Sequence, residues 1–237
     1  MTSPPRRRPI GRTATWATHG ERGLNTVTQA NLEALTREVE RQSAIVDCKN
    51  LMGKVMYYGA AWLNRKMVEL WSSRDDCLLE QPWGIYDGRT GVERCYLQDF
   101  GDRHAPDWEE KHKGVMMLYT CDTPIVQVAE DSQTAKGVWI SSGADTLRAG
   151  DAHPQGYWRW GKYAVDFIRE DGMWKIWKLR FYPFFLTKYD TPWTKAPAYD
   201  WAFFPVTPDR PRETPVYHYD GVAVYPTNEP PIPGVPL

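Results

Sequence analysis

The chain has 237 residues, of which 42% are hydrophobic and 25% charged, so a globular core of ordinary size can form without disulfide bonds or metal. The formal net charge is -1, which excludes an overall positive field that would recruit nucleic acid or an anionic membrane. The four cysteines form no CxxC pair, so neither a zinc knuckle nor a redox motif is indicated. No apolar signal segment opens the chain and no apolar run is long enough to span a bilayer, and we therefore expect a cytoplasmic protein.

Helical patterns come first along the chain. Residues 1–27 are rich in Pro, Arg, Thr and Gly without periodicity, which predicts an irregular N-terminal arm. From Thr28, apolar residues recur at steps of three and four as far as Tyr58, and this spacing predicts a long helix that Gly59 ends. A second, short helix is predicted over 60–71.

Strand patterns follow. Two short strands are predicted over 77–83 and 84–88, then a short helix over 91–100 and a polar loop over 101–113 that leads into or flanks a helix. Longer strands are predicted over 115–127, with an interruption at the Asp122-Thr123-Pro124 bend, and over 134–142, 157–169 and 173–182. The last two strands are joined by Glu170-Asp171-Gly172, a strong turn signal. Helices followed by a meander of antiparallel strands predict an α+β fold with the N-terminal helices packed on one face of the sheet.

We therefore expect one folded domain over 28–182. The remaining residues, 183–237, form a Pro- and aromatic-rich extension that we expect to pack on the body or on a neighbouring subunit. The 12 Trp and 13 Tyr exceed what one core requires, which favours both an oligomer interface and a pocket that stacks on a flat substrate. The expected partners are a small aromatic molecule and further copies of the chain, in a dimer or trimer.

Several segments of the sequence resemble the SnoaL-like family of the nuclear-transport-factor-like cone fold. The resemblance is carried by Tyr57-Tyr58, Leu70-Trp71, Asp75-Asp76, Glu80 to Gly88, Thr123 to Val128 with Asp131, Thr134 to Trp139, Gly161 to Tyr163 with Asp166-Phe167, and Asp171 to Ile176. It covers about Ala44 to Arg180 and implies a curved antiparallel sheet, similar to that of scytalone dehydratase, that encloses a mainly apolar conical pocket with a few polar groups.

Within that family, the aromatic load and the long termini are similar to sphingomonad-type lyases that act on lignin-derived diaryl dimers. This closer resemblance implies a lyase without a cofactor, which removes water and formaldehyde from a phenolic diarylpropane diol through a quinone methide to give a stilbene. Two alternatives stay open. One is a dehydratase or isomerase of another aromatic or polycyclic molecule, and the other is a non-catalytic ligand-binding or assembly domain. A pocket crossed by ionisable groups favours an enzyme, and an all-apolar pocket favours the last alternative.

Candidate acid-base groups come from two regions. His104 and His112 lie just before a predicted pocket strand, and imidazole is the natural acid-base group near neutral pH, although a loop histidine can also be bonded only locally. Family members often carry a histidine before the turn into the Pro-Ile strand, where this chain has Tyr119 or a neighbour. The other candidates lie on the long helix, where a buried phenol or ammonium could serve: Tyr57, Tyr58, Lys49 and Lys54.

Candidate substrate-binding residues are taken from the predicted strands. They are Trp83, Tyr119, Trp139, Trp160, Lys162 and Arg180. Strand alternation sends such residues to two faces, so only some can line a pocket, and Arg159 and Arg180 can each be a pocket cation or a surface charge. No nucleotide fingerprint, phosphate loop or metal-ligand spacing is present, so we expect no cofactor and no metal.

Overall fold

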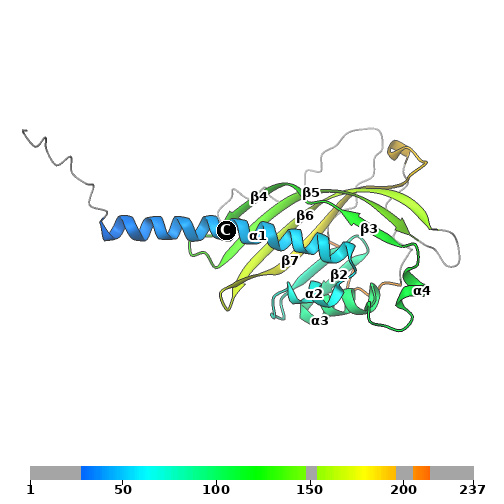
Figure 1. The fold of residues 1–237 in the computed structure, drawn as a ribbon, viewed down its shortest axis with the longest axis horizontal. Helices are drawn as coiled ribbons and strands as arrows, with labels where there is room; N and C mark the ends of the chain where they lie inside the picture. The colour runs from blue at the N-terminus through cyan, green and yellow to red at the C-terminus, as the bar shows by residue number, and fades with distance from the viewer. Residues whose placement is uncertain (1–27, 148–153, 196–204, 214–237) are drawn as a thin grey trace, which may run out of the picture. The chain divides into compact units, whose positions relative to one another are not determined.

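A computed structural model describes residues 28–147, 154–195 and 205–213 (Figure 1). The chain divides into two compact units, Met1–Arg37 and Glu38–Leu237. The expected arm over 1–27 lies outside the described residues. No helix in the described ranges has both the length and the apolar character needed to cross a membrane.

Helices precede most of the sheet along the chain. The helical elements are α1 (Gln29–Ala60), α2 (Asn64–Glu69), α3 (Gly88–Arg94), the π-helix η1 (Cys95–Asp99), α4 (Trp108–His112) and the short 3-10 helix η2 (Trp193–Lys195). The strands are β1 (Leu78–Gln81), β2 (Gly84–Asp87), β3 (Met116–Tyr119), β4 (Asp122–Val128), β5 (Thr134–Leu147), β6 (Gln155–Glu170) and β7 (Met173–Lys188).

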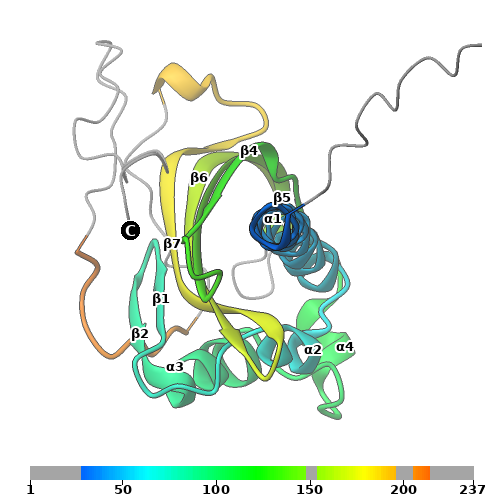
Figure 2. The same cartoon turned by 90° about the vertical axis from the view of Figure 1, so that its left-hand side faces the viewer.

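The strands form one sheet in the order β2-β1-β7-β6-β5-β3, and β4 also pairs with β5. All pairs are antiparallel except β1 with β7, which are parallel. The sheet is curved, and the part of α1 from Glu38 onward lies on its concave side (Figure 2). Cys48, Leu51 and Val55 of α1 share one buried apolar cluster with Val165 and Phe167 of β6. The predicted α+β fold, with an N-terminal helix on a curved sheet, is therefore confirmed.

Three predicted strand limits need correction. β5 continues five residues past Ser142, and β7 continues six residues past Tyr182. The strand predicted over 115–127, with an interruption at Asp122-Thr123-Pro124, is two strands, β3 and β4, which are separated by Thr120 and Cys121. The predicted interruption lies inside β4, where the register against β5 shifts between Asp122 and Ile125 and Thr123 has a φ of 49°. The predicted 91–100 helix begins three residues earlier and ends as a π-helix.

Residues 205–213, here named the C-terminal strap, lie along the edge of β2. The N–H of Ile85 donates to the carbonyl of Arg210 at 2.9 Å, and the N–H of Asp209 donates to the carbonyl of Ile85 at 2.8 Å. A Cβ on Gly84 would lie 2.6 Å from the Pro208 ring, so glycine permits the close approach. The strap therefore covers an edge that would otherwise offer free backbone groups.

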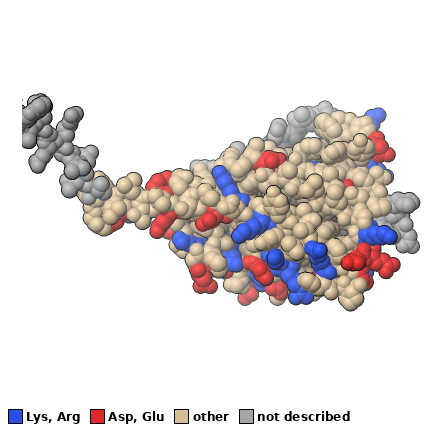
Figure 3. Space-filling view, in the orientation of Figure 1, with Lys and Arg blue, Asp and Glu red and all other residues tan. Residues whose placement is uncertain are grey.

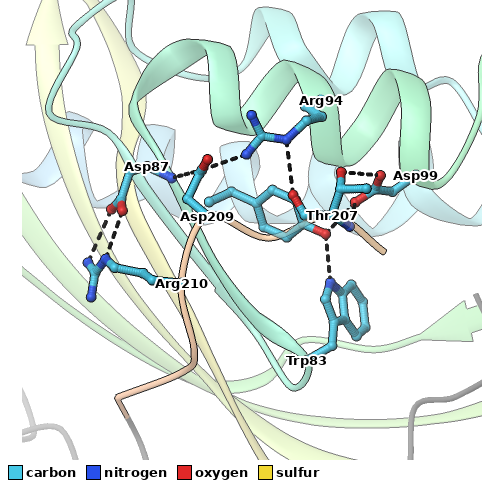
Figure 4. Close-up of polar contacts among 8 residues, drawn as sticks. Trp83, Asp87, Arg94, Asp99, Thr207, Asp209 and Arg210 are labelled. Carbon is cyan, nitrogen blue, oxygen red and sulfur yellow. Dashed lines mark hydrogen bonds and ion pairs between the residues drawn. The ribbon is translucent and has the colours of Figure 1, made fainter. Parts of the chain in front are cut away.

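Ionic and hydrogen-bonded contacts hold the C-terminal strap in place (Figure 4). The hydroxyl and N–H of Thr207 donate to Asp99 at 2.8 and 2.9 Å. Asp209 pairs with Arg94 at 2.6 Å, and Arg210 pairs with Asp87 at 2.7 Å. Elsewhere, acidic and basic side chains are intermingled on the face shown in Figure 3, which fits the near-zero net charge.

Candidate active site

Strand alternation places one arginine on the concave face of the sheet. Along β6 the odd-numbered residues from Tyr157 to Phe167 are buried and the even-numbered residues are more exposed. Arg159 therefore shares the core side with Val165 and Phe167, and its side chain is only 6% exposed. Asp145 of β5 is 1% exposed, so a second ionisable group is buried in this sheet. Buried charged side chains are rare unless they are paired or functional.

Three neighbouring strands bring the polar groups together. Tyr119 of β3 and Arg159 of β6 both face Gly143 of β5 in the sheet register. The hydroxyl of Tyr119 donates to Oδ1 of Asp145. Nη2 of Arg159 donates to the hydroxyl of Tyr163 at 3.2 Å. We name these four residues, Tyr119, Asp145, Arg159 and Tyr163, the Arg159 cluster.

Two aromatic rings fix the guanidinium of Arg159. Its Cζ lies 3.6 Å from the ring centroid of Tyr119 and 4.4 Å from that of Phe181. Both rings occupy space that glycines leave open, since a Cβ on Gly143 would lie 2.3 Å from the Tyr119 ring and one on Gly161 would lie 2.2 Å from the Phe181 ring. The missing side chains thus allow two cation–π contacts to hold one arginine.

Burial tunes the acidity of the Arg159 cluster. It raises the pKa of Asp145, although the nearby Arg159 charge and the Tyr119 hydroxyl both favour the ionised form. Burial also raises the pKa of Tyr163 to about 12. Oδ2 of Asp145 is buried and accepts no hydrogen bond from any described residue. A carboxyl of this kind can hold a proton at higher pH than usual and can give it up to a bound group.

The comparisons with known proteins identify the family. The model of the SnoaL-like domain matches residues 40–180. The chain belongs to the SnoaL-like family. No curated protein matches its sequence.

Solved structures share the fold of this SnoaL-like chain. A type 2 hexachlorocyclohexane dehydrochlorinase (LinA) is 15% identical with a TM-score of 0.52, over 65% of this chain and 95% of that one. The LinA-type3 dehydrochlorinase of Novosphingobium barchaimii LL02 is 16% identical with a TM-score of 0.51, over 65% and 96%. A further LinA structure is 14% identical with a TM-score of 0.52, over 68% and 99%. At these identities the likeness concerns the fold.

Three of the four expected acid-base residues on α1 of the SnoaL-like domain are exposed. Lys49 and Lys54 are exposed, and Tyr57 is 80% exposed. Tyr58 is half-buried and packs against the hydrophobic core. None of the four takes part in the hydrogen bonds and cation–π contacts given above for the Arg159 cluster, and their role in proton transfer stays a prediction.

The two histidines lie in and before α4. His112 is half-buried, with Nδ1 2.9 Å from the carbonyl oxygen of Trp108 and Nε2 3.1 Å from that of Phe100. Its ring stacks on Trp108 with the centroids 4.5 Å apart. These contacts link α4 to the end of η1, as a structural histidine would. His104 is exposed, and its backbone N–H donates to the side chain of Asp102 at 3.1 Å.

The expected binding residues are divided between several places. Tyr119 belongs to the Arg159 cluster. Trp139 is buried on the core side, with its ring edge-on to Phe167 at 6.0 Å. Trp83 donates to the hydroxyl of Tyr86 at 2.9 Å, within the contacts that also involve Asp99 (Figure 4).

The other three expected binding residues lie on the opposite face of the sheet. Trp160 and Lys162 take even-numbered positions in β6, and the ammonium of Lys162 lies 5.9 Å from the ring centroid of Tyr182. Arg180 lies 3.6 Å from Glu80 and 4.0 Å from Asp166, so its charge is compensated by carboxylates of neighbouring strands.

Sequence reasoning missed Asp145 and left Arg159 ambiguous. The alternation of β6 could have assigned Arg159, because Arg159 has the same parity as Val165 and Phe167. Asp145 lay beyond the predicted end of its strand, so its direction could not be inferred. Among the described residues, no group of three or more His, Cys, Asp or Glu side chains is arranged to hold a metal.

Proposed function

We propose that this SnoaL-like protein is a cofactor-independent lyase that eliminates water from a hydrophobic aromatic alcohol at the Arg159 cluster. The observation that carries the proposal is the buried carboxyl of Asp145, which has one oxygen bonded to Tyr119 and the other without a partner among the described residues. Arg159, fixed between two rings, supplies a positive charge close by. A proton donor beside a fixed cation is what an elimination through an anionic or polarised intermediate needs.

The favoured substrate is a lignin-derived phenolic diarylpropane diol. In the first step the benzylic carbon–oxygen bond breaks, Asp145 gives its proton to the departing hydroxyl to form water, and the para-phenol passes its proton to solvent water, which leaves a quinone methide. In the second step the Asp145 carboxylate takes the proton of the primary hydroxyl. The bond to that carbon then breaks, formaldehyde leaves, and the electron pair forms the stilbene double bond and a phenolate. Arg159 stabilises the negative charge of the phenolate oxygen. Protonation of that oxygen by solvent completes the turnover.

The family supports elimination chemistry in a general way. The structural neighbours named above are dehydrochlorinases, which by name remove the elements of hydrogen chloride. An aromatic alcohol would present hydroxide, a poorer leaving group than chloride, so it requires the proton donor that Asp145 provides. The ionisable groups on the concave face favour an enzyme over a non-catalytic binding domain.

The decisive experiment incubates the full-length protein with a phenolic diarylpropane diol and measures stilbene absorbance and formaldehyde together. Equal amounts of both products are expected from the wild type. Asp145→Asn should lose both, and Glu130→Gln, at an exposed turn, should lose neither. Water loss without formaldehyde would replace the proposal with a plain dehydratase. Binding of the diol without turnover would favour a ligand-binding domain.

A further inference from the structure

An aromatic hollow lies on the sheet face opposite the Arg159 cluster. It has a cavity volume of about 700 Å³ and opens between the start of β6, the end of β7 and η2. Six aromatic side chains form much of its wall, namely Trp158, Trp160, Phe184, Phe185, Tyr189 and Trp193. Its volume is in the range of small-molecule sites.

The rings of this aromatic hollow form a continuous surface. The centroids of Trp158 and Tyr189 are 6.1 Å apart, those of Trp160 and Phe185 are 5.2 Å apart, and Trp158 and Trp160 are neighbours at 6.4 Å. Phe185 in turn stacks on Trp193 at 5.6 Å with an interplanar angle of 21°. Trp158, Trp160, Tyr189 and Trp193 all remain at least one-third exposed, so a bound molecule can reach their faces.

The charge of the hollow points to the kind of ligand. Asp190 is the one ionisable acid or base, apart from the Tyr189 phenol, among the described residues of the lining, which contains no Lys, Arg or His. Aromatic faces are regions of negative potential, and a carboxylate beside them adds a full negative charge. On the same sheet face, the ammonium of Lys162 already lies 5.9 Å from the ring centroid of Tyr182, so aromatic rings here do receive a cation.

We propose that the aromatic hollow is a binding site for an organic cation whose charge is surrounded by apolar groups, such as a quaternary or methylated ammonium group. The rings surround the cation and Asp190 balances its charge. A neutral flat molecule could use the ring surface but would gain nothing from Asp190. A strongly hydrated metal ion would gain little from a wall made mainly of rings. The site is separate from the Arg159 cluster and does not depend on the lyase proposal.

The test titrates choline into the full-length protein by calorimetry, and compares it with the neutral alcohol in which a tert-butyl group replaces the trimethylammonium group. The two probes have nearly the same shape and differ in charge. We expect saturable binding of choline, and binding of the neutral alcohol that is weaker by about tenfold or more. Equal binding of the two probes, or no binding of choline, would overturn the proposal.

Matched variants locate the binding. Asp190→Asn keeps the shape of the side chain and removes its charge, and Trp193→Ala removes an exposed ring. Both should weaken choline binding, while Glu130→Gln and Tyr57→Ala, at exposed positions outside the hollow, should not. Melting temperatures of all four variants show whether they fold. Folded Asp190→Asn and Trp193→Ala variants that bind choline like the wild type would contradict the assignment.

Discussion

The guanidinium of Arg159 is centred 3.6 Å from the ring centroid of Tyr119, whose hydroxyl in turn donates to Asp145. One tyrosine therefore contacts the cation through its ring face and the carboxyl through its hydroxyl. Phe181 covers Arg159 as well, with its ring centroid 4.4 Å from the guanidinium. This arrangement limits reorientation of the guanidinium during a reaction, which is the property that an electrostatic catalyst requires.

Replacing Asp145 by asparagine tests its role in proton transfer. The amide keeps the size of the carboxyl but cannot donate or accept a proton in turnover. We expect the rate of stilbene formation to fall by roughly two to four powers of ten, with substrate binding little changed. The melting temperature should stay the same or rise, because burial disfavours the charged carboxylate. A variant that keeps near wild-type turnover would show that the chemistry lies elsewhere, and Tyr58 and His112 would be the next residues to change.

Adding one methyl group at Gly143 tests whether the Tyr119 ring needs the space beside this glycine. A Cβ there would lie 2.3 Å from the ring of Tyr119 and 2.3 Å from the carbonyl oxygen of Leu118. Gly143→Ala should therefore lower the free energy of unfolding by roughly 1–3 kcal/mol and reduce turnover by displacing Tyr119. The control is Gly53→Ala in α1, where a Cβ meets nothing within 4 Å. That variant should gain about 0.5–1 kcal/mol, because alanine favours helix. Equal stability of the two variants would contradict the close packing described at Gly143.

The stability contributed by Asp145 should depend on pH in an unusual direction. Burial raises its pKa in the folded state, so its contribution is complete below the unfolded pKa of about 3.9 and is lost as pH rises through the folded pKa. In urea unfolding between about pH 4 and pH 8, the wild type should lose stability relative to Asp145→Asn as the pH increases.

Asp76 provides the comparison of opposite sign. The hydrogen bond from Arg74 lowers the pKa of Asp76 to about 2, so its contribution is lost as pH falls through that value. Asp76→Asn should therefore differ from the wild type at neutral pH and converge with it in acid. Because the two differences from the wild type have opposite signs at neutral pH, a general loss of stability with pH cannot produce both.

Removing Asp99 tests what anchors the C-terminal strap. Thr207 donates to Asp99 twice, through its hydroxyl and its N–H, and Tyr86 donates to the same carboxylate. Asp99→Ala should release the strap, which hydrogen exchange would detect as faster exchange of the Asp209 N–H, and limited proteolysis as new cleavage within 205–213. Asp131→Ala, at an exposed turn distant in sequence, is the control. Unchanged protection of Asp209 would mean that the backbone bonds to Ile85 and the ion pairs of Asp209 and Arg210 hold the strap without Asp99.

The parts of the fold that the sequence predicted are those with local causes. The three- and four-residue spacing of apolar side chains marked α1, and the Asp171-Gly172 pair marked the β6–β7 turn. The missed strand limits depend on residues distant in sequence. A proline normally ends a strand, but Pro183 pairs with Gly161 where the register between β6 and β7 shifts and Phe184 of β7 has no partner in the register, and a proline is tolerated at such a bulge.

The candidate site was harder to predict than the fold. The histidines and the tyrosines of the helix could be chosen as candidates by residue type alone. The Arg159 cluster could be predicted only by knowing which strands are neighbours in the sheet. Tyr119, Asp145 and Arg159 come from three strands, and no spacing along the chain states that β5 separates β3 from β6. The role of Gly143 could not be predicted either, because the space beside it is filled by the ring of Tyr119 from another strand.

The parallel pairing of β1 with β7 bears on how the chain is made. Leu79 of β1 pairs with Leu179 of β7, 100 residues later. A nascent chain that has released α1, β1 and β2 from the ribosome therefore cannot complete its sheet until nearly all of β7 has emerged. Contacts between such distant residues slow folding, and the apolar side of α1 stays open in the meantime. Synthesis of this protein should consequently be sensitive to chaperone supply, and chains stopped before β7 should aggregate.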